Sequence, residues 1–148
     1  MPVLSLALNI LWVVFGGLWM AAGWLLAAVF MVITIIGIPW ARAALTMAWY
    51  TLLPFGQTAV RRDSYGREDI GTGLFGAIGN ILWFVFAGWW LALGHLITAF
   101  GLAVTIIGLP FAWAHLKLAA LALWPIGTEV ITTDEAESRR RLLGRGAY

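Results

Sequence analysis

A few ionisable residues interrupt the long apolar stretches of this chain, and they are the residues there that could do chemistry. Arg42 and Lys117 carry the charges. A charge in an apolar segment that enters a membrane is costly and usually faces a partner or a water-filled passage. Both cations are therefore candidates for the lining of an anion pathway. The alternative is that their long stems carry the charge to the lipid headgroups, above all for Arg42, which lies one to two turns from a predicted helix break.

Four neutral polar residues lie in the same stretches. His95 and His115 belong to different segments, and they are either hydrogen-bonded core residues or parts of a pH-sensitive gate. Asn9 and Asn80 either cap the aromatic segments from the headgroup layer or line a polar passage. Together with the two cations, these four residues are the candidate pore or selectivity residues.

The sequence carries no motif of conventional enzyme chemistry. GxxxxGK[ST], HExxH and GxSxG are all absent, and the chain has no cysteine. We therefore predict that the protein is not an enzyme and has no catalytic residue, metal site or cofactor. A lipid-modifying enzyme ranks lowest among the function hypotheses, because no nucleophile or acid–base pair is available for it.

The composition indicates an integral membrane protein. Hydrophobic residues make up 62% of the chain and charged residues 11%, whereas soluble domains have about 45–50% and 25%. No acidic or basic residue occurs from Met1 to Trp40, a run well beyond the roughly 20 apolar residues that a span needs. Because this run lacks a basic n-region, it does not resemble a cleaved signal peptide and we expect it to be retained.

An internal repeat organises the chain. TIIGIP at Thr34 to Pro39 returns as TIIGLP at Thr105 to Pro110, and residues 9–56 align with residues 80–127 without a gap. Gly and Pro stand where each helix would otherwise continue, so both copies predict a helix break, at Gly37 and Pro39 and at Gly108 and Pro110. The breaks are turns between spans or, if they lie at membrane depth, they leave helix N-termini that offer partial positive charge to an anion.

We predict an all-α integral membrane protein of two tandem pseudo-symmetric repeats. Each repeat has a long helix, a Gly-x-Pro break and a shorter helix, which gives about four spans. A helix from Pro2 to Ile36 would exceed the bilayer thickness of roughly 30 Å. It is therefore either strongly tilted or preceded by an interfacial turn from Asn9 to Phe15, and we favour the turn because tryptophans suit the headgroup zone.

Two hydrophilic segments follow the two repeats. Segments 57–62 and 129–133 are rich in Thr and β-branched residues, so we expect short strands that can pair as a small cytoplasmic β-hairpin. The predicted divisions are a first membrane repeat over 1–56, a loop over 57–75, a second repeat over 76–127 and a tail over 128–148.

The distribution of arginine predicts the orientation. The loop has three Arg and the tail four, while the turns at the two breaks have none, so both segments and both termini are expected in the cytoplasm and the two halves in parallel orientation. These arginines are topology signals or headgroup contacts. The other interpretation is a nucleotide phosphate site that combines residues of the loop and the tail, namely Arg61, Arg62, Arg139, Arg140 and Arg141.

The repeated motifs resemble those of a known family. The paired NILW-x-x-F-x-G-x-W segments begin at Asn9 and Asn80, and both repeats carry TIIG-x-P and end in L-x-P-x-G. This pattern is similar to the YccF family of small bacterial inner-membrane proteins and covers nearly the whole chain outside the loop and tail. The resemblance implies two copies of one inner-membrane domain and, from some members, an anion-selective channel that responds to nucleotides.

These observations favour an oligomeric ion channel that prefers anions, because every Asp and Glu lies outside the apolar segments and no acidic ring is available to select cations. The alternative is a non-transporting scaffold that positions another protein through the loop and tail. A carrier would need several chains, since two parallel repeats leave little room for alternating access. The expected partners are the lipid bilayer, further copies of the chain, an inorganic anion and a nucleotide at the cytoplasmic face, but no nucleic acid.

Overall fold

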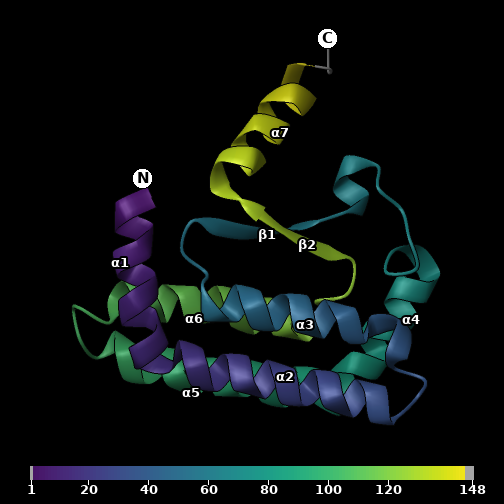
Figure 1. Ribbon diagram of the computed structural model, residues 1–148, viewed down its shortest axis with the longest axis horizontal. Helices are drawn as coiled ribbons and strands as arrows, with labels where there is room; N and C mark the ends of the chain where they lie inside the picture. Colours follow the sequence, from purple (N-terminus) through teal and green to yellow (C-terminus); the bar gives the residue numbers. More distant parts are fainter. Residues whose placement is uncertain (1, 146–148) are drawn as a thin grey trace.

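The computed structural model describes residues 2–145 as a mostly helical fold with a small sheet (Figure 1). The first half contains α1 (Pro2–Trp12), a π-helical turn (Val13–Gly17), α2 (Leu18–Ile33), α3 (Ile38–Leu52) and β1 (Gln57–Arg61). After a 3₁₀ turn (Asp63–Tyr65), the second half contains α4 (Gly73–Trp83), a π-helical turn (Phe84–Gly88), α5 (Trp89–Ala103), α6 (Leu109–Leu123), β2 (Thr128–Thr132) and α7 (Thr133–Arg145). The repeat in the sequence is thus a repeat of structural elements.

The helices stop and restart at both Gly-x-Pro segments. Pro39 and Pro110 lie in the first turn of α3 and α6, where the missing proline N–H leaves no helical hydrogen bond unmade. A Cβ at Gly108 would lie 2.1 Å from the Leu102 carbonyl oxygen, and one at Gly37 would lie 2.5 Å from the Met31 carbonyl oxygen. Glycine is therefore required at both turns by the close approach of the backbone.

The first long apolar segment is bent. Phe15 and Gly16 leave the helical conformation within the π-helical turn, and Gly16 has a φ of +124°, which only glycine adopts without strain. Figure 1 shows α1 standing across α2. The turn lies later than the expected one from Asn9 to Phe15, because Asn9 is still helical in α1.

The four central helices form a bundle, called the helix layer below, in which each half contributes one hairpin and α3 and α6 lie above α2 and α5 in Figure 1. α2 packs along α3, and α5 packs along α6, while α2 and α5 meet between the halves. In Figure 1, α2 runs from left to right and α5 from right to left. A bilayer whose normal followed these helices would be crossed in opposite directions by the two halves, and the parallel orientation expected from the arginines stays a prediction.

Tryptophan and alanine dominate the core between the helices. Trp12, Trp24 and Trp83 are fully buried, and small residues such as Ala27 and Ala44 let the helices approach closely. Equivalent hydrogen bonds hold both halves, because the Trp12 indole donates to the Thr51 carbonyl and the Trp83 indole donates to the Ala122 carbonyl, each over 2.7 Å. The buried indole N–H groups are thus satisfied by the ends of α3 and α6.

The two strands pair as the sequence predicts, although the helices of the second repeat separate them in the chain. β1 and β2 are antiparallel, with Gln57 opposite Thr132 and Arg61 opposite Thr128. We call this pair the β-ribbon. Figure 1 places it alongside α3, with α7 beyond it, so one strand from each half closes the same side of the helix layer.

Two segments in residues 2–145 are long and apolar enough to cross a membrane. They are Val3–Ile33 and Gly73–Ala103, with 31 residues each, and α6 is a shorter apolar helix. Each long segment contains one of the π-helical turns, so neither is a single straight helix.

Candidate functional site

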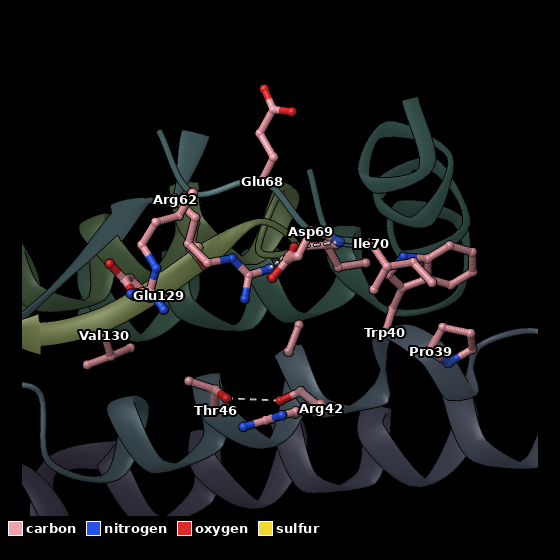
Figure 2. Close-up of a pocket in the computed structure, with 15 residues that line it drawn as sticks. Pro39, Trp40, Arg42, Thr46, Arg62, Glu68, Asp69, Ile70, Glu129 and Val130 are labelled. Carbon is pink, nitrogen blue, oxygen red and sulfur yellow. Dashed lines mark hydrogen bonds and ion pairs between the residues drawn. The ribbon is translucent and has the colours of Figure 1, made fainter. Parts of the chain in front are cut away.

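A polar cleft of about 630 Å³ lies between α3 and the β-ribbon (Figure 2). The first turns of α3 form its floor, with Pro39, Trp40, Arg42 and Thr46, while β2 and the linker between β1 and α4 form its roof. The floor belongs to an apolar helix, and the roof belongs to the two hydrophilic segments of the chain. The cleft is therefore the place where the two kinds of surface meet.

Ion pairs neutralise most of the charge on the roof. Arg62 contacts Asp69 over 3.0 Å, and Arg67 contacts Glu129 over 2.8 Å. Glu68 also borders the cleft, but Figure 2 shows its side chain directed away from the floor. Of the roof groups, the Nε atom of Arg62 is buried and makes no hydrogen bond within the described residues.

Arg42 supplies the uncompensated charge on the floor. Its backbone carbonyl accepts a hydrogen bond from Thr46 over 3.0 Å, but its guanidinium forms no ion pair with any acidic residue in 2–145. A guanidinium without an acidic partner, at the floor of an open cleft, can hold an anion by charge-assisted hydrogen bonds. The cleft can thus bind a small anion or a phosphate group.

Lys117 occupies a related place on α6, outside the cleft. Its ammonium lies 5.6 Å from the ring centre of Trp113, one turn earlier on the helix. Trp113 aligns with Arg42 in the repeat, so the two cations lie within one helical turn of equivalent positions. The contact also fits the headgroup anchoring that the sequence leaves open, because a tryptophan and a snorkelling lysine suit the interface equally well.

The two histidines meet deep in the core, away from the cleft. The Nδ1 atoms of His95 and His115 lie 2.9 Å apart, and the Trp24 indole donates to Nε2 of His95 over 3.3 Å. With both rings neutral, His95 donates from Nδ1 to His115, and the proton of His115 lies on Nε2. That Nε2 atom is buried and unpartnered within the described residues, and a Cβ at Gly16 would lie 3.3 Å from it.

The two histidines are thus fixed by core packing and hydrogen bonds. Among residues 2–145, no group of three or more His, Asp or Glu side chains is close enough to hold a metal ion. The pair does not share the cleft with Arg42.

Asn9 and Asn80 clamp the chain just after α3 and α6. The amide of Asn9 donates to the Phe55 carbonyl and accepts from the Phe55 N–H, each over 3.0 Å. Asn80 makes the same two bonds to Ile126 over 2.9 Å. The side-chain amides of Asn9 and Asn80 therefore position the strands and do not line the cleft.

The arginines proposed for nucleotide phosphate do not gather at one point. Arg61 pairs with Asp63 over 3.1 Å, and its hydrogen bond lowers the pKa of the Asp63 carboxyl. Arg139 pairs with Glu129 and Glu135, which raise the pKa of its guanidinium. Arg140 and Arg141 are exposed on α7, so only Arg62 of this set lines the cleft.

Three other cleft residues were missed at the sequence level. Trp40 is buried with its indole nitrogen unpartnered among the described residues, and Asp69 and Glu129 are the anionic partners of the roof. Their common signal is the end of an apolar run beside the hydrophilic segments, which is too general to single them out. The fold brings them together across the gap between β2 and α3.

Comparison with known proteins supports the same two-part organisation. The YccF model, described as an inner membrane component domain, matches residues 7–57 and again residues 78–128. The inner membrane protein YccF of Escherichia coli strain K12 is 36% identical over 145 residues, which are 95% of this chain and 97% of that protein. The YccF protein of Shigella flexneri has the same identity and coverage. No solved structure matches the chain. The chain therefore belongs to the YccF family of inner membrane components.

Proposed function

We propose that this protein is an oligomeric inner-membrane channel that favours anions. The observation that carries the proposal is the pair of cations Arg42 and Lys117 on corresponding faces of α3 and α6, neither of which pairs with an acidic residue in 2–145. All the acidic residues of the chain lie in the β-ribbon, the linker, α7 or their borders. A pathway past these two cations would therefore attract anions and repel cations.

The pathway in this proposal lies between chains. The centre of one chain is filled by Trp12, Trp24 and Trp83, which are fully buried, so an opening through the helix layer would require unpacking of the core. Lys117 is exposed on α6, and Arg42 is exposed on α3 at the floor of the cleft. Assembly of several chains about an axis would bring several copies of each cation to one passage. Conduction through such a passage needs no catalytic group.

Nucleotide sensitivity is a further part of the proposal, and its site differs from the one expected. Arg139 is held by Glu129 and Glu135, whereas the guanidinium of Arg42 at the floor of the cleft pairs with no acidic residue in 2–145. A nucleotide phosphate that entered the cleft would lie against α3. Block of conduction from one side only would support this site.

Current through the purified protein in a planar bilayer with asymmetric KCl tests the proposal. We expect a reversal potential near the chloride value, and Lys117→Glu is expected to shift it towards the potassium value. Arg141→Gln is the control, because Arg141 is exposed on α7 and, among residues 2–145, pairs only with Glu137 over 3.5 Å. An unchanged potential in Lys117→Glu would remove Lys117 from the pathway.

The scaffold interpretation is the competing outcome of the same experiment. Reproducible electrical silence from protein that is folded and oligomeric would contradict the channel. Recovery of a specific protein partner by mild crosslinking through the β-ribbon or α7 would then support the scaffold.

A further inference from the structure

The four central helices are short for membrane crossing. α2 has 16 residues, and α3, α5 and α6 have 15 each. At 1.5 Å per residue this gives roughly 23 Å, whereas the hydrocarbon core is about 30 Å thick. The bend at Gly16 prevents α1 from extending α2 along the same line. α2, α3 and α6 therefore fit within a bilayer more readily than they cross it, whereas α5 continues through the π-helical turn into α4 as a segment of 31 residues.

The charges of the molecule all lie towards one side of the helix layer. In residues 2–145, every Lys, Arg, Asp and Glu belongs to α3, α6, the β-ribbon, the linker to α4 or α7, and α1, α2, α4 and α5 have none. Figure 1 shows the β-ribbon alongside α3 rather than beyond the ends of the helices. Polarity therefore changes along the direction from α2 and α5 to the β-ribbon, across the helices rather than along them.

Both turns of the layer expose large apolar side chains. Ile36 is 69% exposed in the first turn, and Ile107 is 76% exposed in the second. Ile35 has a φ of +59°, a conformation in which a β-branched residue is strained and in which Gly or Asn would be easier. An apolar residue at such a position is favoured where the side chain contacts hydrocarbon instead of water.

The turns also satisfy much of their own backbone. The Thr34 hydroxyl donates to the Met31 carbonyl and accepts from the Gly37 N–H. The Thr105 hydroxyl makes the equivalent bonds to the Leu102 carbonyl and the Gly108 N–H. Internal partners of this kind are what a turn needs where water is absent.

We propose that both Thr-Ile-Ile-Gly turns are embedded in lipid hydrocarbon, with the helix layer along the bilayer plane and the β-ribbon at the water surface. The acyl chains of the lipids are the partner of Ile36 and Ile107. Four crossings by these helices would instead place the two turns in water on opposite faces of the bilayer, because the two hairpins run in opposite directions. The inference concerns the position in the membrane and stands whether or not the protein conducts.

Cysteine labelling in native membranes tests the inference, since the chain contains no cysteine. Ile36→Cys and Ile107→Cys replace exposed side chains, and Ser138→Cys on α7 is the water-exposed control. A charged, impermeant maleimide is applied to intact cells and to inverted vesicles. We expect both turn variants to react, from either side, at least about tenfold more slowly than Ser138→Cys reacts from the side that exposes α7, because charged groups enter hydrocarbon poorly.

Labelling after denaturation in detergent shows that each cysteine is present and reactive. A nitroxide attached to the same cysteines gives the second measurement, and it should collide more often with oxygen than with a water-soluble nickel chelate. Rapid labelling of either turn in native membranes, from either side, would overturn the inference. So would preferential collision of the turn nitroxides with the nickel chelate.

Discussion

The indole nitrogen of Trp24 lies 3.3 Å from Nε2 of His95, the residue that occupies the aligned position in the second repeat. The two halves of the molecule therefore meet at equivalent positions. Two tryptophans there would both be donors with no acceptor between them, whereas histidine supplies the acceptor. The difference between the repeats at this position is what lets them join by a hydrogen bond.

Replacing His95 by Phe should destabilise the protein by about 1–3 kcal/mol, because the Trp24 N–H and Nδ1 of His115 both lose their partner in the core. Reversible unfolding in detergent measures the change. Trp24→Phe and the double variant complete a cycle, and we expect the two changes to be non-additive. Strictly additive free energies would show that the contact contributes nothing.

Asn80→Leu should cost about 1–3 kcal/mol, because it leaves the N–H and the carbonyl of Ile126 unpaired beside a buried site. Asn9→Leu removes the equivalent bonds to Phe55, but Asn9 is only partly buried. Water can replace part of its contacts, so the smaller loss is expected there. Thermal unfolding of the two variants gives the order, and a larger loss at Asn9 would contradict it.

Gly108→Ala should reduce stability by about 2–4 kcal/mol, since the added Cβ would lie 2.1 Å from the Leu102 carbonyl oxygen and the turn must open. Gly101→Ala is the matched control in the preceding helix, where an added Cβ meets nothing within 4 Å. Alanine favours helix, so this control should be neutral or slightly stabilising. Unfolding curves that do not separate the two variants would count against the turn geometry.

Acid should weaken the anchoring of β1. The Arg61 hydrogen bond lowers the pKa of Asp63 below its ordinary 3.8, so the contribution of the pair is complete above that value and is lost as the pH falls through the lower folded pKa. The difference in unfolding temperature between the wild-type protein and Asp63→Asn should therefore vanish in strong acid. A difference that persists unchanged below the folded pKa would contradict this pairing.

Local patterns were enough to predict several parts of the fold. β-Branched residues after each repeat predict the strands at 57–62 and 129–133. The pairing of these strands is confirmed by the register of Gln57 with Thr132. The family and the largely helical class also follow from the sequence, because the same motifs occur twice at one spacing. These features depend on residues that are close neighbours in the chain.

The remaining features depend on contacts between distant residues. Asn9 and Asn80 each bind a backbone group 46 positions away, and no local signal marks that partner. The opposite directions of α2 and α5 follow from how the halves pack, which arginine counts do not determine. The cleft combines Arg42 with Arg62 only because the β-ribbon folds back over α3.

The pairing of β1 with β2 imposes an order on biosynthesis. β1 is translated before any residue of α4, α5 or α6, and its partner strand is translated only after all three. The first half must wait in the nascent chain with an unpaired strand edge, to which chaperones or another nascent chain have access. The edge of β1 can close only after β2 has been translated, so the segment that follows the second repeat completes a structure begun by the segment that follows the first.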